Sequence, residues 1–74
     1  MPMKRVFKVK EIISILISQG WYMDRQNGTS HRQFKHPTIL STVTVNGKLS
    51  EVVWIENLKS IERQTGINFK NLTE

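Results

Sequence analysis

The chain has 74 residues, no cysteine and a formal net charge of +5. A chain of this length predicts one small domain, residues 1–74, that buries only about 60% of its unfolded surface, which excludes a deep enclosed active site. The lack of cysteine excludes disulfides and thiolate metal sites, and the longest apolar run, residues 12–17, is too short to span a membrane. We therefore expect a cytoplasmic protein, and the charge favours a polyanionic partner, either nucleic acid or an acidic protein.

The first segment with helical periodicity covers residues 8–19. Its apolar side chains recur at the spacing of a single helix face: Val9, Ile12, Ile13, Leu16 and Ile17. Gly20 suits the left-handed position that follows a helix, and Trp21 can then fold back onto Leu16. The pattern predicts a helix that leads directly into a strand.

Three strands are predicted next. Residues 21–26 form the first strand, and Asn27-Gly28 is the strongest short signal for a hairpin turn. Residues 30–36 form the return strand of this hairpin. Residues 41–47 alternate polar and β-branched side chains, which is typical of a third strand.

The last segment returns to helical spacing. Its start is left open by the sequence, with Ser50 as a possible cap and a start near Trp54 as the alternative. Trp54, Leu58, Ile61 and Thr65 share one face, and Gly66 is placed to end the helix. The predicted fold is α+β with the order α-β-β-β-α. Both helices should cover the same face of a three-stranded antiparallel sheet, because neither helix can bury its apolar stripe alone.

Alternation along the strands assigns the two faces of this sheet. The side chains predicted to point inward are Trp21, Met23, Phe34, Val43 and Val45. Those predicted to point outward are Tyr22, Asp24, Gln26, His31, Gln33, Lys35, Thr42, Thr44 and Asn46. Both tryptophans and Phe34 are interpreted as core residues, and His36 as a structural residue bonded to the backbone at the sheet edge. The outward face is therefore polar and partly basic.

The most reactive side chain on the outward face is His31, near the tip of the hairpin. An exposed imidazole can be a general acid or base, a metal ligand, an RNA contact or an ordinary surface residue. His36 lies five positions further along the strand and points to the opposite face, so we expect neither a metal site nor a cofactor. Ser30 is adjacent to His31 and also faces away, which argues against a serine nucleophile. The residues alone predict a basic domain with a nucleic-acid-binding face.

Several ordered motifs resemble the HicA toxin family of bacterial toxin–antitoxin pairs. The resemblance begins at VKEIISILISQGW, continues through GTSHRQFKHPT, VTV, GKLS and LKSIERQTGI, and ends at Ile67. It implies a fold similar to double-stranded RNA-binding domains. It also implies a metal-independent endoribonuclease that cleaves mRNA and blocks translation, and a HicB-like antitoxin that masks the face carrying His31. The functional histidine of the family matches His31, although the turn before it is one residue longer than the Gly-Ser-His of many members.

The chemistry implied by the resemblance needs no cofactor, because RNA carries its own nucleophile in the 2′-hydroxyl. His31 is the predicted catalytic acid or base. The predicted substrate contacts are Arg32 and Lys35 to phosphate, Tyr22 stacking on a base, and Gln33. Each of these side chains can equally be an ordinary solvated surface residue.

Three further residues are predicted to support this site: Asp24, Gly28 and Ser30. If Asn27-Gly28 forms a two-residue turn, Asp24 lies directly across from His31. Two other functions remain open at this point. One is a non-catalytic RNA-binding module of the same fold, and the other is a structural role as one half of a regulatory protein complex.

Overall fold

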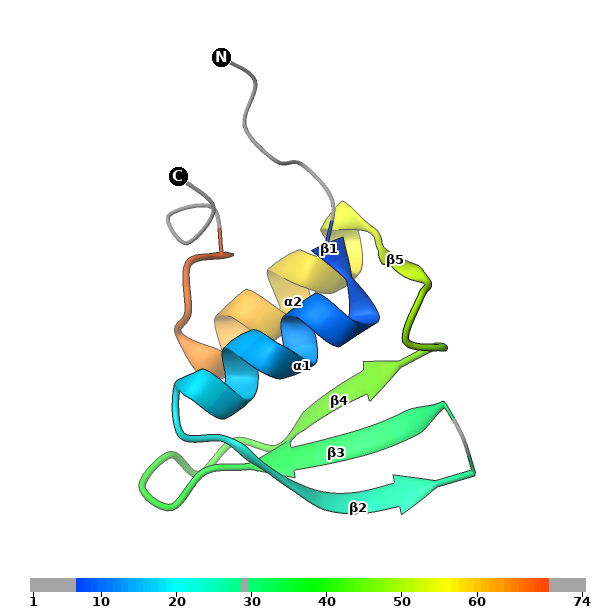
Figure 1. Ribbon diagram of the computed structural model, residues 1–74. Coiled ribbons are helices and arrows are strands. Elements are labelled where there is room, and N and C mark those ends of the chain that lie inside the picture. The colour runs from blue at the N-terminus through cyan, green and yellow to red at the C-terminus, as the bar shows by residue number, and fades with distance from the viewer. Residues whose placement is uncertain (1–6, 29, 70–74) are drawn as a thin grey trace.

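The computed structural model describes residues 7–28 and 30–69 of the chain. Its elements are, in chain order, β1 (Phe7–Lys8), α1 (Val9–Ser18), β2 (Tyr22–Asn27), β3 (His31–Lys35), β4 (Val43–Asn46), β5 (Val52–Val53) and α2 (Ile55–Thr65). Strands β2, β3 and β4 form an antiparallel sheet in that order, and both helices lie over one face of it (Figure 1). The predicted α+β arrangement of two helices over a three-stranded antiparallel sheet is confirmed.

Two short strands were not predicted. Strands β1 and β5, of two residues each, pair antiparallel in a separate small sheet. They are too short to show alternation in the sequence, yet they place the start of α1 beside the segment that leads into α2. The first N–H groups of a helix lack intrahelical partners. Here Val9 N–H donates to the Glu51 carbonyl at 2.8 Å and Lys10 N–H to the Leu49 carbonyl at 3.1 Å.

The ends of both helices agree with the sequence signals. Gly20 has a φ of 97°, and the N–H of Trp21 donates to the Leu16 carbonyl at 2.9 Å. Gly66 ends α2 in the left-handed conformation, with a φ of 77°. Glycine is needed at both positions because an L side chain is strained at such angles. The structure decides the start of α2, which the sequence left open: Trp54 is the residue just before the helix.

The core lies between the helices and the inner face of the sheet. It consists of Phe7, Val9, Ile12, Leu16, Trp21, Phe34, Val43, Val45, Val53, Leu58, Ile61 and Phe69. The predicted burial of Trp21, Phe34, Val43 and Val45 is confirmed.

Three burial predictions are wrong. Trp54 is 63% exposed because it lies in extended backbone before α2 and not on the buried face of that helix. Ile17 is 58% exposed, at the edge of the apolar stripe of α1. Met23 is 49% exposed because both helices pack against β4, whereas β2 packs chiefly against β3.

Candidate functional site

The hairpin that carries His31 has a three-residue loop. Asn27 pairs with His31, so residues 28–30 connect the strands, and Thr29 lies outside the described residues. Gly28 adopts a φ of 64°, and its carbonyl accepts a hydrogen bond from the Gln26 carboxamide at 3.1 Å. The two-residue turn on which the expected position of Asp24 depended is therefore not the one that forms. Compared with a two-residue turn, the longer loop gives each residue of β2 a different partner on β3.

A second irregularity lies further along β2, at Asp24. Met23 pairs with Phe34 and Arg25 pairs with Gln33, so Asp24 is the extra residue of a bulge. A bulge reverses the facing of the residues beyond it, because side chains alternate along a strand. Because of the bulge, Arg25 faces the same side of the sheet as Gln33. In an unbroken strand, alternation from Tyr22 would place Arg25 on the opposite side.

The two irregularities correct the predicted position of Asp24. Asn27, and not Asp24, lies across from His31. Asp24 lies instead beside Lys35, with its carboxylate 3.6 Å from the Lys35 ammonium, and both side chains are exposed. The outward prediction for Gln26 is also wrong, because Gln26 pairs with the inward-facing Arg32.

The pairing arranges the uncovered side of the sheet, here called the outer face, in three rows. The rows are Asn27–His31–Asn46, Arg25–Gln33–Thr44 and Tyr22–Lys35. All of these residues are exposed except Gln33, which is half-buried. The outer face is thus an open surface of amide, hydroxyl, phenol and basic groups, with His31 on its central strand. Sequence reasoning missed Arg25 and Asn27 as members, because only the bulge turns them outward.

Asn46 is the cross-strand partner whose backbone lies closest to that of His31. Gly47 N–H donates to the Ser30 carbonyl at 2.8 Å, which makes Ser30 and Gly47 a hydrogen-bonded pair. Because hydrogen-bonded and non-hydrogen-bonded pairs alternate, His31 and Asn46 form a non-hydrogen-bonded pair. In such pairs the Cα atoms are about 4.5 Å apart and the side chains approach most closely. His31 therefore lies between Asn27 and Asn46 on the neighbouring strands, with the Cα atom of Asn46 the nearer.

Arg32 lies on the opposite side of the sheet from His31. Its side chain is buried, with 7% of the residue exposed, and Nη1 donates to the Gly47 carbonyl at 2.8 Å. This bond ties β3 to the turn that follows β4. The structure therefore does not bring Arg32 together with His31, although sequence reasoning placed both at one site.

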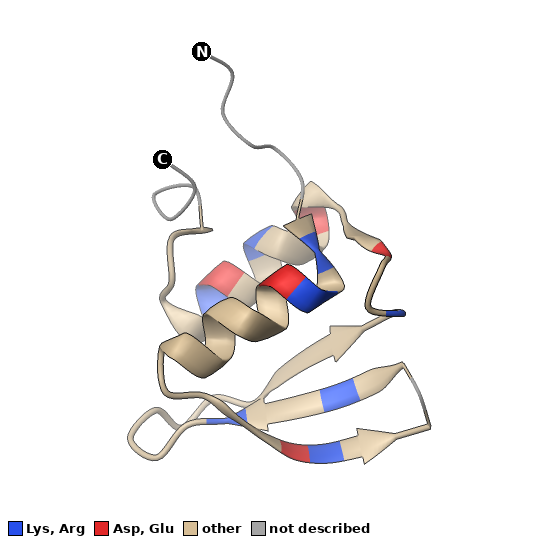
Figure 2. Cartoon of the chain, in the orientation of Figure 1, with Lys and Arg blue, Asp and Glu red and all other residues tan. Residues whose placement is uncertain are grey.

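Lys35 and Tyr22 occupy the other end of the outer face. Lys35 is four residues from His31 on β3, which corresponds to about 13 Å along a strand. Tyr22 pairs with Lys35 and is 48% exposed. Both residues line a hollow of about 250 Å³, whose lining also includes the loop residues Leu40, Ser41 and Thr42. Charged residues on the sheet are confined to β2 and β3, and β4 carries none (Figure 2).

His36 has the structural role that the sequence predicted. Thr38 N–H donates to Nδ1 at 3.1 Å, so Nδ1 is the unprotonated nitrogen. Nε2 then carries the proton and donates to the Gln19 carbonyl at 3.2 Å. The ring also packs edge-on against Trp21, with the centroids 5.2 Å apart. Nε2 therefore holds the α1–β2 junction against the end of β3, and Nδ1 holds the segment that follows β3.

Neither a metal cluster nor a membrane-spanning helix is present in the described part of the chain. Within residues 7–28 and 30–69, no group of three or more His, Asp or Glu side chains could hold a metal ion. Neither of the two helices in these ranges is long and apolar enough to cross a bilayer.

The comparison with known families matches residues 9–67 to the family model described as the HicA toxin of bacterial toxin–antitoxin systems. The chain belongs to the HicA toxin family. The match runs from the start of α1 to just beyond α2, so it includes all three strands of the outer face. No curated protein matches the chain at a significant level. As a HicA-family toxin, the protein has its role in a toxin–antitoxin system, with an antitoxin as its partner.

Proposed function

We propose that this HicA-family toxin is an endoribonuclease that cleaves mRNA, with His31 as its acid–base group. The observation that carries the proposal is the position of His31, an exposed imidazole on the central strand of an open polar face, between Asn27 and Asn46. Imidazole is the side chain best suited to move a proton near neutral pH. The other histidine of the chain, His36, uses both ring nitrogens in structural hydrogen bonds.

The proposed reaction is an attack within the RNA itself. His31 takes the proton of the 2′-hydroxyl, the 2′-oxygen bonds to phosphorus, and the bond to the 5′-oxygen breaks. The imidazolium returns its proton to the 5′-oxygen, which leaves as a hydroxyl. A positioned acid or base of this kind contributes roughly 10² to 10⁴-fold in rate. The carboxamides of Asn27 and Asn46 are donors placed to stabilise the charge on the phosphate oxygens.

The proposed RNA path runs along the outer face. Lys35 and Arg25 contact phosphates, and Tyr22 offers a ring on which an unpaired base stacks. The hollow beside Tyr22 and Lys35 gives such a base a place at the end of the face away from His31. Arg32 is not part of this path, because its guanidinium is buried on the other side of the sheet.

The proposal predicts the chemistry of the cleaved ends. Incubation with a single-stranded mRNA in excess EDTA should yield 2′,3′-cyclic or 3′-phosphate ends and free 5′-hydroxyls, because the nucleophile belongs to the RNA. Mass spectrometry of the fragments identifies these ends directly. Products with 5′-phosphates would show that water is the nucleophile and would refute the mechanism. Tight RNA binding without any cleavage would instead establish the non-catalytic RNA-binding module.

The charges around Lys35 should tune RNA affinity in opposite directions. In a His31→Ala background, which avoids cleavage, Lys35→Ala should weaken binding and reduce the slope of log K against log salt by about 0.7, the value for one phosphate contact to a single strand. Asp24→Asn should strengthen binding, because it removes the carboxylate 3.6 Å from the Lys35 ammonium. Lys59→Ala, which removes an exposed lysine on α2, is the matched control. A loss of affinity in Lys59→Ala equal to that in Lys35→Ala would mean that binding follows net charge and not this face.

A further inference from the structure

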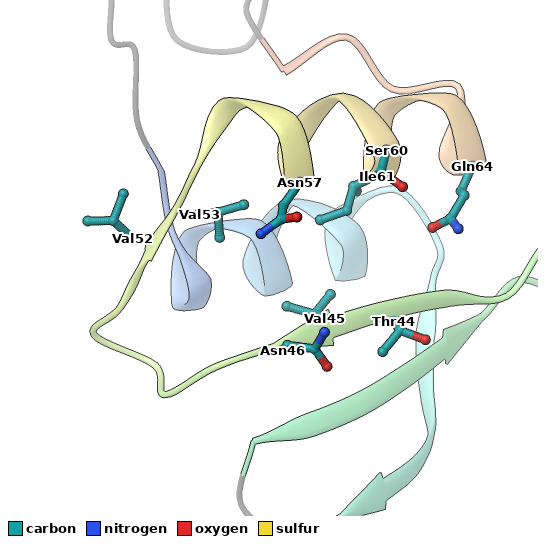
Figure 3. Close-up of a pocket in the computed structure, with 9 residues that line it drawn as sticks. All are labelled: Thr44, Val45, Asn46, Val52, Val53, Asn57, Ser60, Ile61 and Gln64. Carbon is teal, nitrogen blue, oxygen red and sulfur yellow. The ribbon is translucent and has the colours of Figure 1, made fainter.

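A groove of about 220 Å³ lies between β4 and α2, at the edge of the sheet farthest from β2 (Figure 3). β4 forms one wall, through Thr44 to Asn46, and α2 forms the other. The groove is separate from the hollow beside Tyr22 and shares only Thr44 and Asn46 with the outer face.

The backbone of β4 presents unpaired hydrogen-bonding groups to this groove. Gly47 N–H bonds to the Ser30 carbonyl, so the backbone groups of Val43, Val45 and Gly47 point toward β3. Those of Thr44 and Asn46 therefore point the other way, into the groove. No strand of the described residues pairs with this edge of β4. Such an edge is a template for an additional strand.

The facing wall of the groove is polar and uncharged. Asn57, Ser60 and Gln64 come from successive turns of α2, and the carboxamides of Asn57 and Gln64 extend toward β4 in Figure 3. No hydrogen bond of these three side chains occurs within residues 7–28 and 30–69. The apolar part of the lining comes from Val45 of β4, Val52 and Val53 of β5, and Ile61 of α2. The groove thus combines a free strand edge with amide and hydroxyl groups that can bond to side chains.

These features favour an extended peptide over a nucleic acid. No residue that lines the groove is charged, whereas phosphates are neutralised by lysine or arginine. Alternating N–H and C=O groups along one edge are matched by another strand, and pockets beside that edge select its side chains. Family membership gives this toxin a protein partner.

We propose that an extended segment of the antitoxin adds as a fourth strand to the free edge of β4. Its backbone bonds to Thr44 and Asn46, and its inward side chains are uncharged and polar, bonding to Asn57 and Gln64. Neighbouring strands lie about 4.8 Å apart, so this strand would flank Asn46 on the side away from His31. The proposal rests on the family and on the groove, and not on the ribonuclease chemistry of His31.

Amide hydrogen exchange tests the proposal residue by residue. In the free toxin, NMR should show fast exchange at Thr44 and Asn46 and slow exchange at Val43 and Val45, which bond to β3. Addition of the cognate antitoxin should slow exchange at Thr44 and Asn46 by at least about tenfold, because each amide then donates a backbone hydrogen bond to the added strand. A complex that forms while these two amides still exchange at the free rate overturns the proposal.

Two further arms identify other occupants. Protection of Thr44 and Asn46 in the toxin alone, increasing with its concentration, would show that a second copy occupies the edge. Protection by a single-stranded RNA added to the His31→Ala toxin would assign the groove to nucleic acid. Either result overturns the assignment to the antitoxin.

A groove-filling variant gives an independent test. Ser60→Tyr places a ring between the two walls and should weaken antitoxin binding at least tenfold, while RNA cleavage by the free toxin is retained. Lys59→Tyr adds the same ring at the adjacent exposed position, outside the groove, and should bind as the unmodified toxin does. Unchanged antitoxin affinity in folded Ser60→Tyr contradicts the proposal. If the wild-type toxin does not cleave RNA at all, the proposed ribonuclease function is refuted. The comparison of antitoxin affinities would still test the groove.

Discussion

We expect His31→Ala to abolish detectable RNA cleavage and the growth inhibition caused by the toxin, while the protein remains folded. The expected loss in cleavage rate is roughly 10² to 10⁴-fold, the contribution of a positioned general acid or base. The fold should persist because His31 is exposed, and exposed substitutions usually change the free energy of unfolding by about 0.5 kcal/mol or less. Cleavage is measured on a single-stranded mRNA, and folding by circular dichroism and urea denaturation.

The second histidine provides the matched control for this experiment. His36→Ala removes the hydrogen bonds to Gln19 and Thr38 and the ring contact with Trp21, so it should lower the free energy of unfolding. The cleavage rate per folded molecule should be retained. The catalytic assignment of His31 fails if folded His31→Ala cleaves RNA at the rate of the wild type. It also fails if only His36→Ala loses activity per folded molecule.

Arg32→Ala should lower the free energy of unfolding by about 1.5 to 3 kcal/mol, the range for a hydrogen bond that involves a charged group. The substitution deletes the guanidinium that donates to the Gly47 carbonyl and leaves that carbonyl without this donor. It also removes the apolar stem of a side chain that is only 7% exposed. Urea denaturation gives the change in stability, and RNA binding is measured under conditions in which the variant is folded.

Comparing Arg25→Ala with Arg32→Ala distinguishes the proposed RNA contact of Arg25 from the structural role of Arg32. Arg25 is exposed on the outer face, so its loss should change stability by about 0.5 kcal/mol or less and weaken RNA binding. Arg32→Ala should show the reverse, with lower stability and unchanged affinity of the folded molecule. If Arg32→Ala instead keeps the stability of the wild type and loses RNA affinity, the hydrogen bond from Arg32 to the Gly47 carbonyl does not stabilise the sheet as proposed.

Local patterns were sufficient to predict the main elements. The spacing of apolar residues identified both helices, and Gly20 and Gly66 marked their ends, because only glycine adopts the left-handed conformation there without strain. Alternation predicted that Val43 and Val45 face the core, since side chains on a strand alternate whatever lies around them. These signals depend only on neighbours in the chain.

Burial at the ends of elements could not be predicted in this way. Trp54 continues the apolar spacing of α2 but is exposed, and Phe69 is buried through a contact with Phe7 at the other end of the chain, with ring centroids 5.8 Å apart. Whether such a side chain is covered depends on which distant segment packs over it. Periodicity within one element carries no information about that segment.

The strand that carries His31, and the direction in which His31 points, were determined by the sequence itself. Phe34 lies three positions further along β3 and must be buried, so alternation turns His31 to the other face. Only the tertiary structure decided which side chains surround His31. Asn27 comes from β2 and reaches His31 through the three-residue loop, whereas Asn46 comes from β4, whose register against β3 is independent of that loop. A change of one residue in the register gives every residue of a strand a new cross-strand partner. The turn signal in the sequence did not specify the register.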